Sequence, residues 1–363
     1  MDRRIWQHYD PYLLGALLLL LVYGVAMIYS ASHTIEKVQD SALRQAVFAF
    51  LGLFLGFVVT AIDYRLLDAF TVPLYVLIVV LLAAVFVIGQ ITFNAQRSID
   101  LGIVDLQPSE LSKPALIVVL AAFLAKREEA SHQWLTLLLS VLLVALPVAL
   151  IYFEPDLSTA LVLIFIWGAM VFASGIPWIY LAVVLGGGLA AVPLIWMSME
   201  PYMRSRVITL INPTSDPQSY YNVQQALYAI GSGGWFGKGY LRGTQSQLHF
   251  LLVQHTDFVF AVLCEELGIA GAVLLFALLA VVLLRTLRAA RMARDTFGRL
   301  LCVGVAAWVF FQCAVNIGMN LNLLPATGLP LPFISYGGSS LVTLLAAMGL
   351  VQSVRLRHRK LEF

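Results

Sequence analysis

The chain has 363 residues, of which 61% are hydrophobic and only 12% are charged, and its formal net charge is +2. A soluble globular domain carries about 25% charged residues, so this composition excludes an ordinary water-soluble protein. The small net charge gives no support to nucleic-acid binding. The composition instead predicts an all-α membrane protein, because a helix satisfies its own backbone hydrogen bonds within hydrocarbon.

Ten apolar stretches are long enough to cross a bilayer, which takes about 20 helical residues. The first resembles a signal peptide, but nine more follow it. We therefore expect an uncleaved first helix and a single transmembrane domain at 1–363. The predicted spans lie at roughly 12–30, 44–62, 71–89, 111–125, 134–152, 157–174, 178–197, 257–284, 300–318 and 340–355.

Basic residues are denser in one set of alternating loops, which includes both chain ends and the segment at 285–299. Loops rich in Lys and Arg stay on the cytoplasmic side of a membrane. We therefore expect both termini in the cytoplasm of a bacterial cell and the 90–110, 198–256 and 319–339 loops outside its inner membrane. Because ATP is absent there, chemistry on that side would need an activated substrate carried by lipid.

Charged residues lie close to the start of the fourth span. Glu110 and Lys113 are three residues apart, so they share a face of a helix beginning near Pro108 and can form an ion pair. Such a pair could place a cation beside an outward cavity, and Arg97 could add a second. The alternative is an ordinary interfacial ion pair.

A very short outward turn contains Asp156, directly before the sixth span. An Asp at this position can accept hydrogen bonds from the first free N–H groups of the helix. We therefore favour capping and orientation of neighbours over direct catalysis for Asp156.

The 198–256 loop is rich in glycine, with Arg206, Lys238 and Gln245 among its polar residues. Glycine permits close backbone approach, so these segments could cradle phosphate oxygens or sugar hydroxyls with backbone N–H groups. The glycines could equally mark turns. The GxxxxGK[ST] pattern of a nucleotide-binding loop does not occur, so an NTP site is unsupported.

Asp257 stands out because it closes this polar loop and opens a long apolar span. Thr256 could cap that helix, and Asp257 in its first turn would be favoured by the helix dipole. The functional interpretation is an ionised general base that faces a polar vestibule. Within a membrane protein an ionisable residue is a functional candidate by default.

The 319–339 loop is apolar but contains several Pro and Gly residues, so it cannot be helical throughout. Non-helical backbone is tolerated at membrane depth only where protein buries it or where it lines a cavity. We expect a re-entrant segment, which includes Ser335, to form one wall of an outward cavity.

A bound metal is not predicted from the residues. Cys264, Cys302 and Cys313 lie in apolar spans without CxxC spacing or a His/Cys cluster, so we interpret them as small hydrophobic residues. A divalent cation such as Mg²⁺ or Mn²⁺ could still neutralise a leaving group.

Several strings, taken together, resemble those of the SEDS family (shape, elongation, division and sporulation), and the resemblance covers essentially the whole chain. Within the family, the strings are more similar to those of the elongation members than to those of the division members. Before His255 the family usually has Pro-Glu-x, where this chain has Leu252-Val253-Gln254. The strings are Arg97, Gln107 to Lys113, Glu154 to Ala160, Asn212-Pro213, Ile230 to Gly239, Gly243 to Leu248, His255 to Phe258 and Leu329 to Ser340.

The resemblance implies a peptidoglycan glycosyltransferase that polymerises lipid II for cell elongation with a class B penicillin-binding protein. The essential Asp of the family corresponds to Asp257, which would take the proton from the acceptor hydroxyl. Its Glu and Lys pair corresponds to Glu110 and Lys113. Candidate contacts to the substrate are Arg97, Glu110, Lys113, Asp156, Arg206, Lys238, Gln245, His255 and Ser335.

Two other functions remain open at this point. A flippase for a lipid-linked sugar would also need many spans and an amphiphilic cavity, but it would need charge accessible from both sides. A scaffold would leave the chemistry to its partner. The few charges within the inner halves of the spans favour the enzyme.

Overall fold

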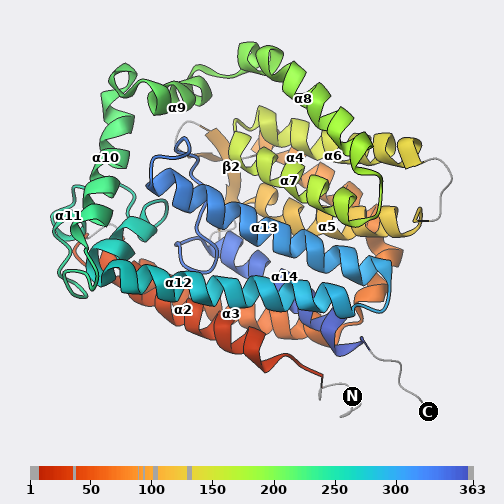
Figure 1. Cartoon of the computed structure of the whole chain (residues 1–363), viewed down its shortest axis with the longest axis horizontal. Helices are drawn as coiled ribbons and strands as arrows, with labels where there is room; N and C mark the ends of the chain where they lie inside the picture. The colour runs from red at the N-terminus through yellow and green to blue at the C-terminus, as the bar shows by residue number, and fades with distance from the viewer. Residues whose placement is uncertain are drawn as a thin grey trace.

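A computed structural model describes residues 8–35, 38–88, 90–92, 95–100, 105–128 and 133–358. Ten long helices make up most of it (Figure 1). They are α2 (Pro11–Ser32), α3 (Ser41–Ala61), α4 (Thr71–Ile88), α5 (Pro108–Ala125), α6 (Gln133–Phe153), α7 (Leu157–Ala173), α8 (Trp178–Ser198), α12 (Val259–Met292), α13 (Thr296–Asn320) and α14 (Gly338–Leu356).

The predicted fold class is confirmed. Within the described part of the chain, nine helices are long and apolar enough to cross a membrane, and α7 is a shorter apolar helix. The rings of His8 and His358 lie 4.8 Å apart, so the chain enters and leaves the bundle at the same end.

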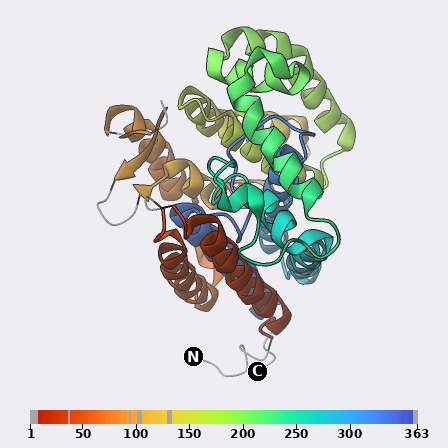
Figure 2. The same cartoon turned by 90° about the vertical axis from the view of Figure 1, so that its left-hand side faces the viewer.

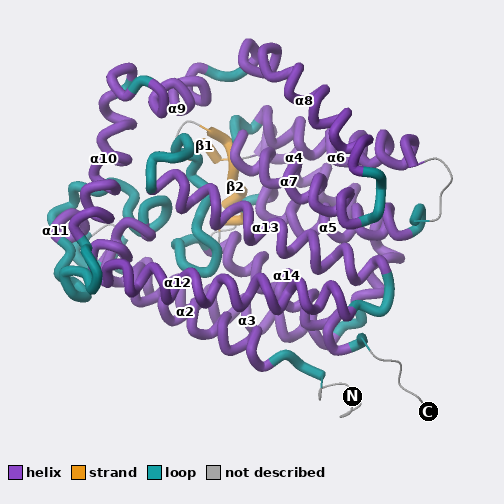
Figure 3. Tube along the Cα trace, in the orientation of Figure 1, coloured by secondary structure: helices purple, strands orange, loops and turns teal. Residues whose placement is uncertain are grey.

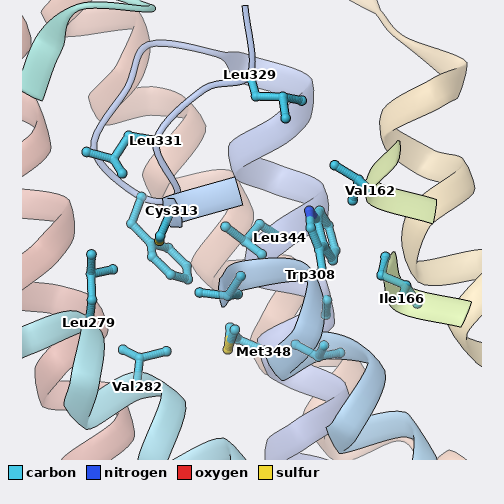
Figure 4. Packing of buried hydrophobic residues seen from close by; sticks show 14 of the residues in the cluster. Val162, Ile166, Leu279, Val282, Trp308, Cys313, Leu329, Leu331, Leu344 and Met348 are labelled. Atoms are coloured by element: carbon cyan, nitrogen blue, oxygen red, sulfur yellow. The ribbon is translucent and has the colours of Figure 1, made fainter. Parts of the chain in front are cut away.

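The core lies between α7, α12, α13 and α14, and α2, α3 and α5 pack around it. Leu279 of α12, Trp308 of α13 and Leu344 of α14 point into this core, and Leu329 and Leu331 reach it from the loop before α14 (Figure 4). By contrast, α8 has no buried residue and continues into an arch formed with α9 (Pro201–Ile211) and α10 (Pro217–Ser232).

Non-helical backbone gathers near α11 (Thr244–Gln247) and between α13 and α14 (Figure 3). The side view separates the α8–α10 arch from α2 and α3 (Figure 2). The remaining elements are η1 (Tyr64–Phe70), η2 (Pro213–Ser215), and three short strands, β1 (Gln90–Thr92), β2 (Ala95–Asp100) and β3 (Asp105–Leu106), which form an antiparallel sheet in that order.

The eighth span differs from its prediction at both ends and in the middle. It runs from Val259 to Met292, and Gly268 breaks it with a positive φ of 65°. The glycine-rich loop crosses α12 at this break. There the N–H groups of Lys238 and Gly239 donate to the carbonyls of Glu265 and Glu266. These glycines therefore allow close packing at a broken helix, and a cradle for a ligand stays a prediction.

Small residues also bring α3 and α14 into close contact. A Cβ at Gly349 would overlap the carbonyl oxygen of Gly56, and the Thr60 hydroxyl donates to the Gly56 carbonyl at 2.7 Å. Open space, in contrast, surrounds Gly186, Gly187 and Gly188 of α8.

We expect Gly349→Ala to lower the free energy of unfolding by about 1–3 kcal/mol, the usual cost of overpacking a tight interior. Thermal unfolding in detergent measures the effect. Gly187→Ala is the matched control, because its added methyl group meets nothing within 4 Å. Equal melting temperatures for the two variants would contradict the close α3–α14 packing.

Candidate active site

Asp257 lies in a turn rather than in a helix. Its N–H donates to the Val253 carbonyl at 3.2 Å, and α12 begins only at Val259. The predicted helix cap at Thr256 and the first-turn position of Asp257 are therefore wrong. The reason is tertiary, because the Asp257 carbonyl turns toward α13 and accepts hydrogen bonds there.

Two buried asparagines of α13 hold that carbonyl. The Nδ2 groups of Asn320 and Asn316 donate to the Asp257 carbonyl at 3.0 and 3.2 Å, and both side chains are fully buried. Asn316 also donates to the Leu329 carbonyl at 2.8 Å. One side chain thus ties the catalytic candidate to the loop before α14.

Residues 321–337 form that loop, and it is non-helical as predicted. Leu329 and residues 331–335 are buried, whereas residues 321–328 are partly or fully exposed. The Ser335 hydroxyl donates to the Thr256 carbonyl at 2.5 Å, and the Tyr336 N–H donates to the His255 carbonyl at 3.0 Å. Gln45 of α3 donates to the Ser335 carbonyl at 3.0 Å. Ser335 therefore holds the two loops together, and a direct contact with substrate stays a prediction.

Asp257, Arg206 and Gly328 meet in one place. A Cβ added at Gly328 would lie 3.8 Å from an Asp257 carboxylate oxygen and 4.0 Å from an Arg206 guanidinium nitrogen. Gly328 has a positive φ of 72°, a conformation that favours glycine. The structure thus brings a carboxylate, a guanidinium and bare backbone together from three separate parts of the chain.

Neither charge is fully neutralised there. Arg206 donates to the Tyr202 hydroxyl and stacks on its ring, while Asp257 accepts a hydrogen bond from Thr256. In the described part of the chain, no ion pair joins Asp257 or Arg206 to an opposite charge within 4.0 Å. Both groups can therefore interact with a ligand.

Burial raises the pKa of Asp257 to about 6, although the Arg206 guanidinium opposes the shift. A carboxyl group with this pKa is mostly ionised at neutral pH and still basic enough to accept a proton. Burial also lowers the pKa of His255, so its imidazole is neutral at pH 7. Of His255 and Arg206, it is therefore Arg206 that carries a positive charge near Asp257 at pH 7.

The predicted Glu110–Lys113 pair is confirmed, at 2.6 Å between Nζ and Oε1. Lys113 is fully buried and lies 5.4 Å from the centre of the Trp308 ring. The Trp308 Nε1 donates to Gln312 at 2.8 Å. This cation therefore lies inside protein, and any role for Glu110 or Lys113 in binding substrate stays a prediction.

Lys238 and Gln245 meet at Glu265 rather than at Asp257. The Lys238 ammonium pairs with the Glu265 carboxylate at 2.8 Å, and the Gln245 N–H donates to it at the same distance. These contacts hold the loop to α12, and direct binding of substrate by either residue stays a prediction.

Asp156 caps α7 as expected, accepting from the Thr159 N–H at 3.1 Å and the Thr159 hydroxyl at 2.9 Å. Ser158 of the same turn donates to the Thr327 carbonyl at 2.7 Å, next to Gly328. The backbone of Arg97 lies in β2, but its side chain is outside the described structure, so its role stays a prediction.

An apolar cavity of about 320 Å³ lies between α3, α4, α5 and α14, away from Asp257. Its wall includes Leu111 and Pro114, which flank Lys113 along α5. Such a lining suits hydrocarbon rather than sugar or phosphate. A group of three His, Cys, Asp or Glu residues that could hold a metal is absent from the described ranges, so the residues there provide no fitted site for Mg²⁺ or Mn²⁺.

Comparison with known proteins identifies the family. The family described as cell cycle protein, covering FtsW, RodA and SpoVE, matches residues 11–360. The chain belongs to this family. The resemblance to the SEDS family found in the sequence is thereby confirmed, and RodA is among its similar structures.

Relatives match over nearly their whole length. The chain is 40% identical over 356 residues to the peptidoglycan glycosyltransferase MrdB of Escherichia coli, with 98% of this chain and 95% of MrdB covered. It matches the RodA structure of Thermus thermophilus with a TM-score of 0.73 and 34% identity, covering 96% and 97% of the two chains. A chain from a peptidoglycan synthase complex that coordinates polymerization and crosslinking matches with a TM-score of 0.82 and 33% identity, covering 96% and 98%.

Sequence reasoning missed Asn316, Asn320 and Gln45. A signal for the first two was present, because two asparagines four residues apart in an apolar span share one helix face. Polar side chains in membrane helices are usually turned toward protein and bonded there.

We expect Arg206→Gln to raise the pKa of Asp257 above about 6, because the guanidinium stabilises the ionised carboxylate. Carboxyl ¹³C NMR of labelled protein, assigned by comparison with Asp257→Asn, measures the shift. Arg204→Gln is the matched control on the same helix. An unchanged pKa in Arg206→Gln would contradict the electrostatic contact.

Proposed function

We propose that this chain is a peptidoglycan glycosyltransferase that polymerises lipid II into glycan strands for cell elongation. Its relatives named as peptidoglycan glycosyltransferases support the reaction class. The observation that carries the proposal is the meeting of the Asp257 carboxylate with Arg206 beside Gly328. These groups supply a base and a cation at one point, which a glycosyl transfer from a pyrophosphate donor requires.

In the proposed reaction, Asp257 takes the proton from the 4-hydroxyl of the acceptor GlcNAc. The freed oxygen attacks the anomeric carbon of the donor MurNAc, and a new C–O bond forms as the bond to pyrophosphate breaks. One displacement inverts an α-linked donor to a β-1,4 product and needs a single protein base. Arg206 is placed to stabilise the negative charge that grows on the leaving pyrophosphate.

The lipid part of such a donor needs an apolar place beside the bundle. The cavity lined by Leu111 and Pro114 has this character. We infer that the active site faces outward from the bacterial inner membrane, since the opposite end of the bundle carries the basic segment at 285–299. A lipid-linked substrate on the outer side of the membrane would then reach the site without passing through the protein.

The comparison with solved structures also supports a partner protein that crosslinks the glycan strands. A chain of similar structure belongs to a complex that coordinates polymerization and crosslinking. We propose that this protein likewise works with a class B penicillin-binding protein, which would supply the transpeptidase. A divalent cation remains a possible helper for the leaving group, but no reaction step here depends on it.

We expect the protein, reconstituted with its partner, to polymerise purified lipid II, and Asp257→Ala and Asp257→Asn to lose at least about 100-fold in rate, the lower range for loss of a general base. Gel analysis of the glycan strands measures the product.

Because the fold binds a proton at Asp257 more tightly than the unfolded chain does, ionisation of this carboxyl costs stability above about pH 4. The Asp257→Asn variant should therefore remain as stable as wild type at pH 7.

Strands made equally by wild type and both variants would overturn the general-base role. Strands from no version, with the partner bound and every variant folded, would favour transport or scaffolding instead.

The rate should also depend on pH in one direction. The base acts when ionised, and its pKa is about 6, so activity should rise through about pH 6 and level off above pH 7. Initial rates between pH 5 and 8 measure this profile. Arg206→Gln should move the midpoint upward, whereas a profile that is flat across this range would contradict the assignment of Asp257.

Asn320 is a positioning residue for the same reaction. Asn320→Ala removes one hydrogen bond to the Asp257 carbonyl, so the carboxylate should be displaced slightly from its reacting position. Because a displacement of a reacting group slows the reaction, we expect roughly a tenfold loss in kcat. KM and the midpoint of the pH profile should change little. Asn322→Gly, at a partly exposed turn of the next loop, is the control, because its positive φ of 54° favours glycine. An unchanged kcat in Asn320→Ala would contradict the clamp.

A further inference from the structure

At the end of the bundle opposite Asp257, Arg355 lies near one carboxylate and two other arginines. Arg285 of α12 binds Asp10, with Nη2 and Nε at 2.6 and 2.7 Å from Oδ2. The charges of Asp10, Arg285 and Arg288 all act on Arg355 of α14. These residues, Asp10, Arg285, Arg288 and Arg355, are called the arginine cluster below.

The arginine cluster carries two more positive charges than negative ones. Asp10 is buried and already satisfied by Arg285 and by the N–H groups of Tyr12 and Leu13. Arg355 is half-buried, and within the described ranges no carboxylate pairs with it. Its Nη1 lies against the Met292 sulfur, and among the residues that the structure describes its buried Nε has no acceptor.

A half-buried guanidinium with an unused donor favours an anion as a partner. Its planar fork matches the oxygens of a phosphate. Arg285, Arg288 and Met292 lie on one face of α12, at i, i+3 and i+7, and this face is turned toward Arg355. An anion beside Arg355 would therefore be reached by Arg288 as well.

Apolar surface adjoins this charged group. Tyr12 is 70% exposed and lies beneath the Arg285 guanidinium, at 5.1 Å from the ring centre. Leu284, one residue before Arg285, is 65% exposed. Cations beside exposed apolar side chains at a membrane helix end match the headgroup and upper acyl chain of a phospholipid.

We propose that the arginine cluster binds the phosphate headgroup of an anionic phospholipid, with Arg288 and Arg355 as its contacts and the exposed side chains of Tyr12 and Leu284 against its acyl chain. Free phosphate shares the headgroup chemistry but not the hydrocarbon. The site is remote from Asp257, and the proposal stands independently of the reaction assigned above.

The test measures binding of fluorescent phosphatidylglycerol to the purified full chain in detergent, in competition with unlabelled lipids. Unlabelled phosphatidylglycerol should compete, and phosphatidylcholine should not. Arg288→Gln and Arg355→Gln should each weaken the affinity about fivefold, the equivalent of the roughly 1 kcal/mol that one basic residue contributes near an anionic membrane surface. Arg291→Gln is the matched control, since it removes the same charge one turn farther along α12, where the charge does not act on Arg355.

Each contrary outcome identifies what replaces the proposal. An equal loss in Arg291→Gln would mean diffuse attraction to the basic end rather than a site. Competition by inorganic phosphate at the concentration of the lipid would mean an anion site without a lipid. Unchanged affinity in Arg288→Gln, whose exposed side chain leaves folding intact, would overturn the proposal outright.

Discussion

The site depends on one constraint: non-helical backbone inside a helical membrane bundle must find its hydrogen-bond partners within the protein. Residues 253–258 and 321–337 both break helical pairing beside the core. Side chains from helices supply the missing hydrogen bonds to this backbone. They are Asn316 and Asn320 of α13 and Gln45 of α3. The geometry of Asp257 is therefore fixed by rigid helices, although the residue itself lies in a turn.

The location of the Asp257 carboxylate and its pKa are determined by different parts of the chain. Its backbone is held by α13, whereas the charge that opposes the burial shift comes from Arg206 on α9, in the arch beyond α8. Within the arch, α8 has no buried residue, whereas Met203 and Thr209 of α9 are buried. The basicity of Asp257 thus depends on a helix other than the one that fixes its location.

How much the sequence could predict divides along physical lines. Hydrophobic length placed the ten helices to within about four residues, except that α12 runs eight residues beyond its predicted end. Local chemistry predicted the Asp156 cap and the Glu110–Lys113 pair, since both interactions span three residues of one helix. The start of α12 was misplaced because Asn316 and Asn320, about 60 residues away, hold the Asp257 carbonyl outside the helix. The contact of the glycines near Lys238 with α12 could not be predicted for a similar reason, since their partner is a break in α12.

Two cations compete for the role of pyrophosphate contact, and their surroundings separate them. Lys113 is fully buried, bound to Glu110 and enclosed by Trp308. Removing one member of a buried pair leaves an unpaired charge and typically costs about 3–5 kcal/mol. Loss of activity on mutating Lys113 would therefore report the fold before it reported the substrate. Among the residues that the structure describes, Arg206 binds the Tyr202 phenol and forms no ion pair, and it lies beside Asp257. In this conformation it is the cation that a leaving group can reach without breaking an existing ion pair.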